Sequence, residues 1–324
     1  MQRREVLLGA TTLLGAGALA HAATAQGWPG RPVRLIIPFP PGGITDISGR
    51  LIARHMSATL GQPVVVENRP GGNTVIAAEL TARAPKDGHT LIIAGTTTLA
   101  INPALRERSP YQPTDFDPVA PLYEAPWTLT VRDRMPVRTV DEFLHYARER
   151  QGQLRYCTNG EGSSSHLFGK MFEAATGVQM IDVAYQGTAP AVTDILAGNL
   201  DVIFESPIAM LAHIRAGSLR TLAVSSAQRV EVLPDAPTFR ELGLPSLEIT
   251  FWSALFAPAG TPAEVIGILN RAANLAMQDQ DIQRRLAADA VTVQLGEPEV
   301  LAGLVRRDAR IWGDVIRSLN LRMG

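Results

Sequence analysis

The sequence predicts an α/β protein of two domains, each a largely parallel sheet covered by helices. Short β-branched apolar runs alternate with helical stretches along the chain, which is the pattern of strands joined by crossover helices. The length of 324 residues corresponds to roughly two domains at about 150 residues each. Several of the helical stretches stop at a glycine, as helices in this class commonly do.

The predicted strands are short apolar runs with few charged residues. Each is rich in β-branched residues and is bounded by turn-forming residues, which is typical of buried strands. They cover residues 33–37, 64–66, 91–93, 154–156, 180–184, 202–204 and 222–224.

The predicted helices have recognisable ends. Residues 45–60 stop at Gly61, and residues 163–176 begin with Ser163 as N-cap and stop at Gly177. Residues 261–264 form a capping box with Pro262 at the first helical position. A last amphipathic helix is predicted over residues 299–319. Its inward side chains are Leu301, Leu304, Val305, Trp312, Val315 and Ile316.

Two stretches are predicted to cross between the domains. Residues 118–131 and 249–262 both combine prolines with an apolar run, and their tryptophans, Trp127 and Trp252, are interpreted as hinge packing rather than ligand stacking. If both stretches cross, the domains are discontinuous. One then holds residues 26–125 and 251–324, and the other holds residues 126–250.

Residues 1–25 predict an export signal. Arg3 and Arg4 precede an apolar run that is shorter than the roughly 20 residues needed to span a bilayer, and small residues follow it. We expect cleavage before Gln26 and a mature protein outside the cytoplasm. The arginine pair fits a twin-arginine signal as well as an ordinary secretory one, and both remain open.

Composition excludes several classes of function. Thirty Lys and Arg against 31 Asp and Glu give a net charge of −1, so nucleic acid is not an expected partner. The single cysteine, Cys157, can form neither an internal disulfide nor a thiol-only metal site, and we interpret it as an inert core thiol. The six histidines are dispersed, and no phosphate-binding or dinucleotide-binding glycine motif is present. We therefore expect no metal and no cofactor.

Two glycine-rich loops between a strand and a helix are candidate anion-binding positions. The first loop is residues 38–43 and the second is residues 158–164. A helix start leaves unpaired N–H groups and a partial positive charge, and glycine lets a ligand approach that backbone. Neither loop contains Lys or Arg, which favours a carboxylate over a phosphate. The alternative is that glycine and proline only turn the chain, with Asp46 as a helix-start charge.

His166 and the nearby serines raise the possibility of a hydrolase. Nucleophilic catalysis needs a serine on a strained elbow such as G-x-S-x-G, with a base in reach. The second loop reads Gly160-Glu161-Gly162-Ser163-Ser164, which lacks that spacing. We interpret His166 as a first-turn residue that bonds nearby backbone.

A series of short motifs occurs in order along almost the whole mature chain. It comprises residues 28–43 with Asp46, then 67–71, 87–91, 160–163 with His166, 185–187, 216–224, 233–238 and 252–262. The series resembles the Bug-type (Bordetella uptake gene) extracytoplasmic solute receptors of tripartite tricarboxylate transporters. That resemblance implies a periplasmic-binding-protein-like (Venus flytrap) fold, with two discontinuous α/β domains and a two-strand hinge.

The resemblance also implies a function. Such a receptor is periplasmic and monomeric, closes on a small organic acid, presents it to membrane permease subunits and performs no chemistry on it. Carried onto this sequence, the ligand-binding residues are Phe39, Gly42, Gly43, Asp46, Thr96, Thr97, Asn159, Gly160, Gly162, Ser163, His166, Tyr185, Gly187, Thr188 and Ala189.

The chain departs from the family pattern at two places. Asn73-Thr74 stands where the family has a second Gly-Gly, and Gln186 stands where it has a lysine. Without that lysine, a dianionic ligand should not be assumed, and the sequence does not identify the carboxylate. An exported α/β enzyme, such as an esterase or isomerase, and a sensing receptor without its own transporter remain the alternatives.

Overall fold

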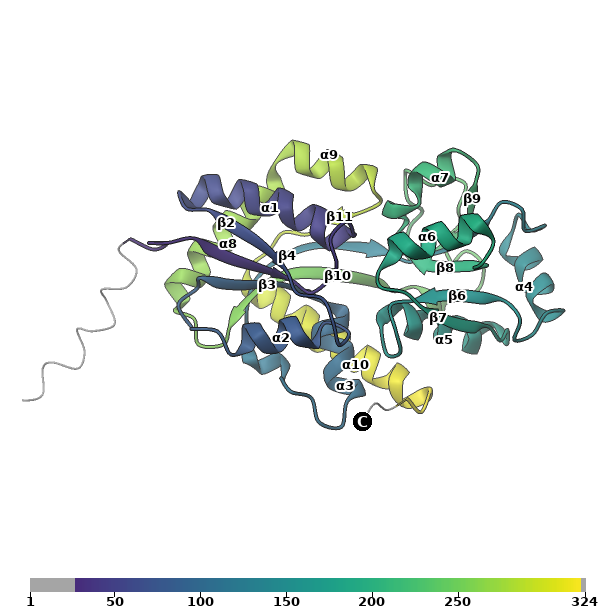
Figure 1. The fold of residues 1–324 in the computed structure, drawn as a ribbon, viewed down its shortest axis with the longest axis horizontal. Coiled ribbons are helices and arrows are strands. Elements are labelled where there is room, and N and C mark those ends of the chain that lie inside the picture. The colour runs from purple at the N-terminus through teal and green to yellow at the C-terminus, as the bar shows by residue number, and fades with distance from the viewer. Residues whose placement is uncertain (1–26, 322–324) are drawn as a thin grey trace, which may run out of the picture.

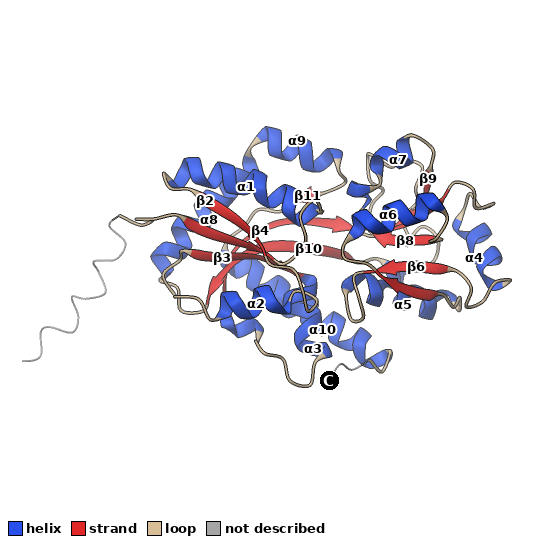
Figure 2. Ribbon diagram, in the orientation of Figure 1, coloured by secondary structure: helices blue, strands red, loops and turns tan. Residues whose placement is uncertain are grey.

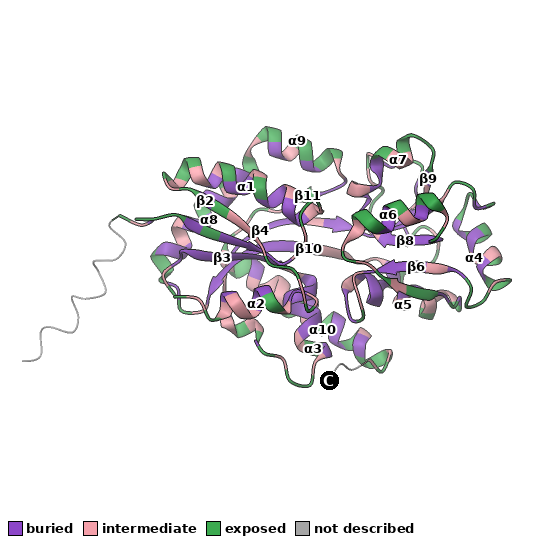
Figure 3. Cartoon of the chain, viewed as in Figure 1, coloured by how far each residue is buried: buried purple, intermediate pink, exposed green. Residues whose placement is uncertain are grey.

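The computed structural model describes residues 27–321 and shows two lobes, each built on one β-sheet with helices on both faces (Figure 1, Figure 2). The predicted export signal lies outside these residues. Buried residues concentrate along the strands and the inner helix faces, whereas the outer helix faces are exposed (Figure 3). No helix within residues 27–321 combines the length and apolar composition needed to cross a membrane.

The first lobe is built on a six-stranded sheet of order β11-β4-β10-β3-β1-β2. β1 lies parallel to β2 and β3, while β10 is antiparallel to β3 and β4. The strands are β1 (Val33–Ile37), β2 (Val64–Asn68), β3 (Thr90–Gly95), β4 (Phe116–Pro126), β10 (Thr250–Pro258) and β11 (Thr292–Val293).

Helices bury both faces of this first sheet. One hydrophobic cluster joins it to α1 (Ile44–Leu60), α8 (Ala263–Gln278) and α9 (Gln280–Ala288). A second cluster on the other face includes residues of α2 (Val75–Ala82) and α10 (Pro298–Ser318). A short π-helix, η1 (Thr96–Ile101), follows β3 and leads into α3 (Asn102–Leu105).

The second lobe is built on a five-stranded sheet of order β7-β6-β8-β5-β9. β6 runs parallel to β7 and β8, and β5 is antiparallel to β8 and β9. The strands are β5 (Thr128–Arg132), β6 (Arg155–Thr158), β7 (Ile181–Ala184), β8 (Val202–Glu205) and β9 (Leu219–Val224). The helices are α4 (Val140–Arg148), α5 (Ser164–Thr176), α6 (Thr188–Ala197) and α7 (Leu211–Arg215).

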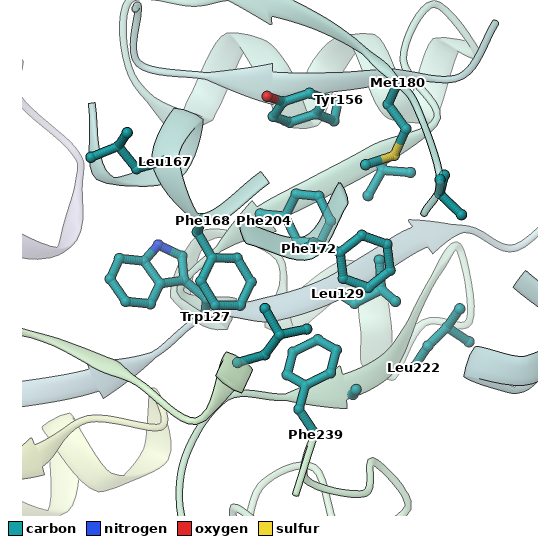
Figure 4. Close-up of a cluster of buried hydrophobic side chains, with 14 of the residues drawn as sticks. Trp127, Leu129, Tyr156, Leu167, Phe168, Phe172, Met180, Phe204, Leu222 and Phe239 are labelled. Atoms are coloured by element: carbon teal, nitrogen blue, oxygen red, sulfur yellow. The ribbon is translucent and has the colours of Figure 1, made fainter. Parts of the chain in front are cut away.

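An aromatic cluster forms the main core of the second lobe (Figure 4). Trp127 stacks on Phe168 with ring centroids 5.1 Å apart, and Phe172 lies 5.2 Å from Phe204. Trp312 of α10 belongs to the same cluster, 6.0 Å from Trp127. The last helix therefore packs against both lobes.

The chain passes between the sheets at Trp127 and returns between Val224 and Thr250. Ser225 ties these two passages together. Its hydroxyl accepts the Trp127 N–H at 2.8 Å and donates to the Ile249 carbonyl at 2.6 Å. Ser225 is fully buried, and its hydrogen bond with the Trp127 N–H is buried as well, so that bond is protected from water.

The predicted fold class is confirmed, including α5, which begins after the Ser163 cap and ends at Gly177 in the left-handed conformation. The predicted capping box at residues 261–264 is wrong. The helix starts at Ala263 with Pro262 as its cap, and the Thr261 hydroxyl donates to the Pro258 carbonyl instead. The predicted domain boundaries stay a prediction.

Candidate functional site

A cavity lies between the two lobes, at the carboxyl ends of the parallel strands β1, β3, β6 and β8. Its volume is about 130 Å³, which corresponds to roughly four water molecules at liquid density or one small organic molecule. Its lining from the first lobe is Phe39–Thr45, Ile93–Thr98 and Phe251–Ser253. Its lining from the second lobe and the crossing is Trp127, Asn159, Ser164, Gln186–Ala189, Glu205 and Ala209.

The first lobe contributes the N-terminus of α1. Its N-cap is Gly43, which has no side chain to cap the helix, and Gly43, Ile44 and Thr45 all line the cavity. The first N–H groups of a helix have no intrahelical partner and carry a partial positive charge. This end of the 17-residue helix is therefore suited to an anion.

Asp46, in the first turn of α1, positions the first loop through hydrogen bonds. Its carboxylate accepts hydrogen bonds from the Gly42 N–H at 3.0 Å, the Asn68 amide at 2.9 Å and Arg50 Nε at 3.0 Å. Burial opposes ionisation of Asp46, but these hydrogen bonds outweigh it and lower its pKa. Asp46 is therefore an ionised residue that positions the loop and does not line the cavity.

The second lobe contributes the N-terminus of α6. Its N-cap Gly187 has φ 97°, a conformation that favours glycine, and no side chain caps the helix. Gly187, Thr188 and Ala189 line the cavity. A methyl group built on Gly187 would lie 3.9 Å from Pro40 of the first loop. The turn before α6 and the first loop therefore approach each other across the two lobes.

The second loop bonds mainly to itself. The Gly160 N–H donates to Thr158 Oγ1 at 3.2 Å, and the Gly162 N–H donates to His166 Nδ1 at 3.2 Å. The Ser163 hydroxyl accepts the His166 N–H at 3.3 Å. Burial lowers the pKa of His166, so its ring is neutral and Nδ1 can accept. Nδ1 thus serves the loop backbone rather than a serine hydroxyl.

The structure brings most of the predicted ligand-binding residues into the cavity wall. Those that line it are Phe39, Gly42, Gly43, Thr96, Thr97, Asn159, Gly187, Thr188 and Ala189. Those outside the lining are Asp46, Gly160, Gly162, Ser163, His166 and Tyr185. The Tyr185 hydroxyl donates to Asp194 at 2.8 Å. Direct contact between any of these residues and a ligand stays a prediction.

Sequence reasoning missed Glu205, the last residue of β8. Asn159 Nδ2 donates to Glu205 Oε1 at 2.7 Å. Burial raises the pKa of Glu205 to about 7, against hydrogen bonds from Ser165, Asn159 and the Ser206 backbone. It is the one ionisable side chain in the lining, which contains no Lys, Arg or His. The predicted strand 202–204 ends one residue before it, so the strand-end rule could have found it.

Asn73 connects the lobes beside the cavity. Its Nδ2 donates to the Gly162 carbonyl in the second loop at 3.1 Å and to Asn102 Oδ1 at 3.1 Å. Asn102 in turn donates to the Asn73 carbonyl at 2.6 Å. Asn73 has φ 53°, which asparagine tolerates better than most residues. One of the two family departures is thus an interlobe contact.

No three His, Cys, Asp or Glu side chains in the described part of the chain are grouped to hold a metal ion. Cys157 is buried in a separate cluster beneath α6, and burial raises the pKa of its thiol well above the usual range. The cavity instead presents main-chain N–H groups, hydroxyls, aromatic rings and one carboxyl group. This is the chemistry of a binding site for a small polar molecule.

Comparison with known proteins gives a consistent result. The model of the tripartite tricarboxylate transporter family receptor, TctC, matches residues 49–321. Protein BugT of Bordetella pertussis is 34% identical over 307 residues, which cover 94% of each chain. The structure of the periplasmic binding protein BugD is similar with a TM-score of 0.86 at 30% identity, covering 91% of this chain and 99% of BugD. The structure of R. palustris Rpa4515 with adipate gives a TM-score of 0.86 at 33% identity and the same coverage.

Proposed function

Because the chain belongs to the tripartite tricarboxylate transporter receptor family, we propose that it binds a small organic carboxylate between its lobes and delivers it to membrane permease subunits. The protein would do this in the periplasm, as a monomer and without chemistry on the ligand. Its moving parts would be the predicted domains, residues 26–125 with 251–324 and residues 126–250, which are joined through Ser225.

One observation carries the proposal: two helix N-termini without side-chain caps, α1 and α6, reach one cavity from opposite lobes. Both offer N–H groups and partial positive charge where the lining has no Lys or Arg. Main-chain donors of this kind suit one carboxylate better than a multiply charged phosphate. The adipate in Rpa4515 is a ligand of that chemistry in a protein of similar fold.

The sequence left two alternatives open, an exported enzyme and a sensing receptor. No feature of the described residues favours either of them over a transport receptor. His166 Nδ1 bonds the Gly162 N–H. A sensing receptor would differ from a transport receptor only in the protein that it contacts after it binds the ligand. Both kinds of receptor would bind a carboxylate, so carboxylate binding is tested first.

The test is a thermal-shift and calorimetry panel on the mature protein, with native mass spectrometry to detect a copurified ligand. The probes are adipate, succinate, butanoate, lactate and benzoate, with glucose and ethanolamine as a neutral and a cationic probe. A bound carboxylate at a hundredfold excess over Kd should add about 2.7 kcal/mol of stability. Stabilisation by glucose or ethanolamine alone would contradict the proposal.

A matched pair of variants locates the site. Ala189 lines the cavity in the first turn of α6, and the exposed Pro190 next to it does not. An acid in a first helical turn is tolerated, so Ala189→Asp and Pro190→Asp should both fold. Ala189→Asp should lose carboxylate binding by a hundredfold or more because a like charge occupies the site, whereas Pro190→Asp should bind almost normally. Equal binding by the two variants would place the carboxylate elsewhere.

A further inference from the structure

Glu205 sits where a ligand in the cavity would meet it. It ends β8, the middle strand of the second sheet, and pairs in register with Thr128 of β5. Protein surrounds the side chain, but part of it remains accessible from the cavity. Asn159 Nδ2 fixes Oε1 at 2.7 Å and itself belongs to the second loop. The carboxyl group is therefore held in a set position beside the binding cavity.

The charge balance of the cavity is unusual for an anion-binding site. Glu205 is the one ionisable group in the lining, and the positive potential there comes from helix N-termini: those of α1 and α6, and that of α5, whose first residue, Ser164, also lines the cavity. A ligand carboxylate in this cavity of about 130 Å³ would share it with the Glu205 carboxyl group. Two ionised carboxylates that close together, away from bulk water, repel strongly. One of them must become neutral.

We propose that Glu205 is the residue that becomes neutral, so that capture of a carboxylate is coupled to uptake of one proton by Glu205. This inference deepens the proposed function and rests on it. The neutral carboxyl group would keep the hydrogen bond from Asn159 and donate its own O–H to a ligand oxygen. An ionised carboxylate can only accept hydrogen bonds, so it could not bind a second carboxylate directly. The proton comes from solvent, and no covalent bond changes.

The unliganded protein is prepared for this step. Burial raises the pKa of Glu205 to about 7, so both protonation states are populated near neutral pH. A bound anion stabilises the neutral state further. A ligand ammonium group would do the opposite and would pair with the ionised form.

The other charged groups near the cavity do not titrate in the same range. On β6, burial and the nearby charge of Glu205 both raise the pKa of the Cys157 thiol. Asp46 on α1 is held ionised by hydrogen bonds that include Arg50. On α5, burial lowers the pKa of His166, and the nearby Lys170 lowers it further. A proton taken up above pH 7 is therefore assigned to Glu205.

The first experiment needs no variant. Calorimetric titration of the wild-type protein at pH 8 is repeated in HEPES and in Tris, using the tightest binder among adipate, succinate, butanoate and benzoate. The dependence of the observed enthalpy on the buffer gives the number of protons exchanged. About nine-tenths of Glu205 is ionised at pH 8 if its pKa is about 7, so we expect uptake of about 0.9 proton. A carboxylate that binds without proton uptake would overturn the proposal.

The second experiment identifies the residue. Glu205→Gln keeps the size and offers an N–H donor to the ligand at every pH, and Asp182→Asn is the control at an exposed acid of β7. Wild type and Asp182→Asn should lose about tenfold in affinity per pH unit above 7. Glu205→Gln should bind the same probe with constant affinity from pH 6 to 9 and with no proton uptake. A pH profile that survives in Glu205→Gln would contradict the assignment.

A third comparison uses two probes of similar length, butanoate and 4-aminobutanoate. Butanoate should take up a proton on binding at pH 8, whereas 4-aminobutanoate, whose ammonium group can pair with ionised Glu205, should not. If butanoate also binds without proton uptake and 4-aminobutanoate binds more tightly, Glu205 acts as a charged partner and the proposal fails while the receptor function stands. If none of the carboxylates binds the wild-type protein, the proposed function itself fails. The two failures are thus distinguishable.

Discussion

Replacing Asn73 should weaken ligand binding by loosening the contact between the lobes. Asn73 Nδ2 donates to the Gly162 carbonyl of the other lobe at 3.1 Å, in a partly buried position. A hydrogen bond of this kind contributes about 1 kcal/mol net, which corresponds to roughly fivefold in affinity if it forms only when the lobes close on a ligand. Asn73→Gly removes this bond without backbone strain, since the position has φ 53°.

The assay is calorimetry with a carboxylate that the wild-type protein binds, supported by urea unfolding of each variant. Thr74→Gly is the control, because Thr74 also has a positive φ but bonds Thr98 and Asn102 within its own lobe. It should lose stability but keep its Kd, whereas Asn73→Gly should show a Kd about fivefold higher. An unchanged Kd in folded Asn73→Gly would refute the reasoning, because the interlobe bond would then add nothing to binding.

Other substitutions test single features of the structure. Glu205→Gln should stabilise the unliganded protein by about 3 kcal/mol at pH 8 but by less than about 1 kcal/mol at pH 5, measured by urea unfolding. The sign follows because the pKa is raised from 4.5 to about 7 in the folded state, so stability falls as the pH rises from about 4.5 to 7 and the full cost is present above pH 7. Gly95→Ala should cost roughly 3 kcal/mol or more, because the new methyl carbon would lie 2.1 Å from the Trp252 carbonyl oxygen, whereas Gly43→Ala meets open space and should change stability by less than about 0.5 kcal/mol. The buried thiol of Cys157 should react with a thiol reagent only after unfolding, and labelling of the native protein would contradict its burial.

Elements with strong local signals could be predicted from the sequence. α5 has a serine cap that bonds its third residue and a glycine that ends it, and both devices act within a few residues of the helix. The Thr261 capping box failed because its hydroxyl found a nearer partner, the Pro258 carbonyl at 2.7 Å. A local motif shows which hydrogen bond is available, but the preceding strand decides which one forms.

The long strands β4 and β10 could not be predicted from local sequence patterns. The sequence predicted residues 118–131 and 249–262 as crossings between the domains, because both stretches combine prolines with an apolar run. In the structure, the ladder of β4 and β10 has register shifts where their partners are Pro121 and Pro118, so the irregular pairing accommodates both prolines. The irregular pairing depends on a strand more than a hundred residues away in the chain, so no local sequence pattern predicts it.

The sequence predicted part of the cavity wall and missed one of its side chains. Glycines and a helix start mark the first loop in the sequence, and it lines the cavity. The same pattern marks the second loop, of which Asn159 and Ser164 line the cavity but Gly160 and Gly162 do not. The turn before α6, which lines the cavity, was expected only from the family resemblance. Glu205 follows a predicted strand directly, but one acid after an apolar run is common and does not by itself indicate a site. The structure singles it out, because Glu205 stands in a cavity wall without Lys, Arg or His and accepts a hydrogen bond from Asn159 at 2.7 Å.

The main chain and the side chains of the cavity would contribute differently to ligand specificity. The proposed function places one carboxylate at the N–H groups of α1 and α6, which are present whatever side chains the chain carries. Discrimination between carboxylates must then come from side chains that face the rest of the ligand, such as Glu205, Gln186 and Phe251. Exchanging Gln186 for the lysine of the family pattern tests this division. A cation there should favour a dicarboxylate such as adipate over butanoate by about tenfold, as one added ion pair of roughly 1 kcal/mol or somewhat more would do. Calorimetry with the two probes measures the ratio, and an unchanged ratio in a folded Gln186→Lys protein would show that the second carboxylate does not reach this turn.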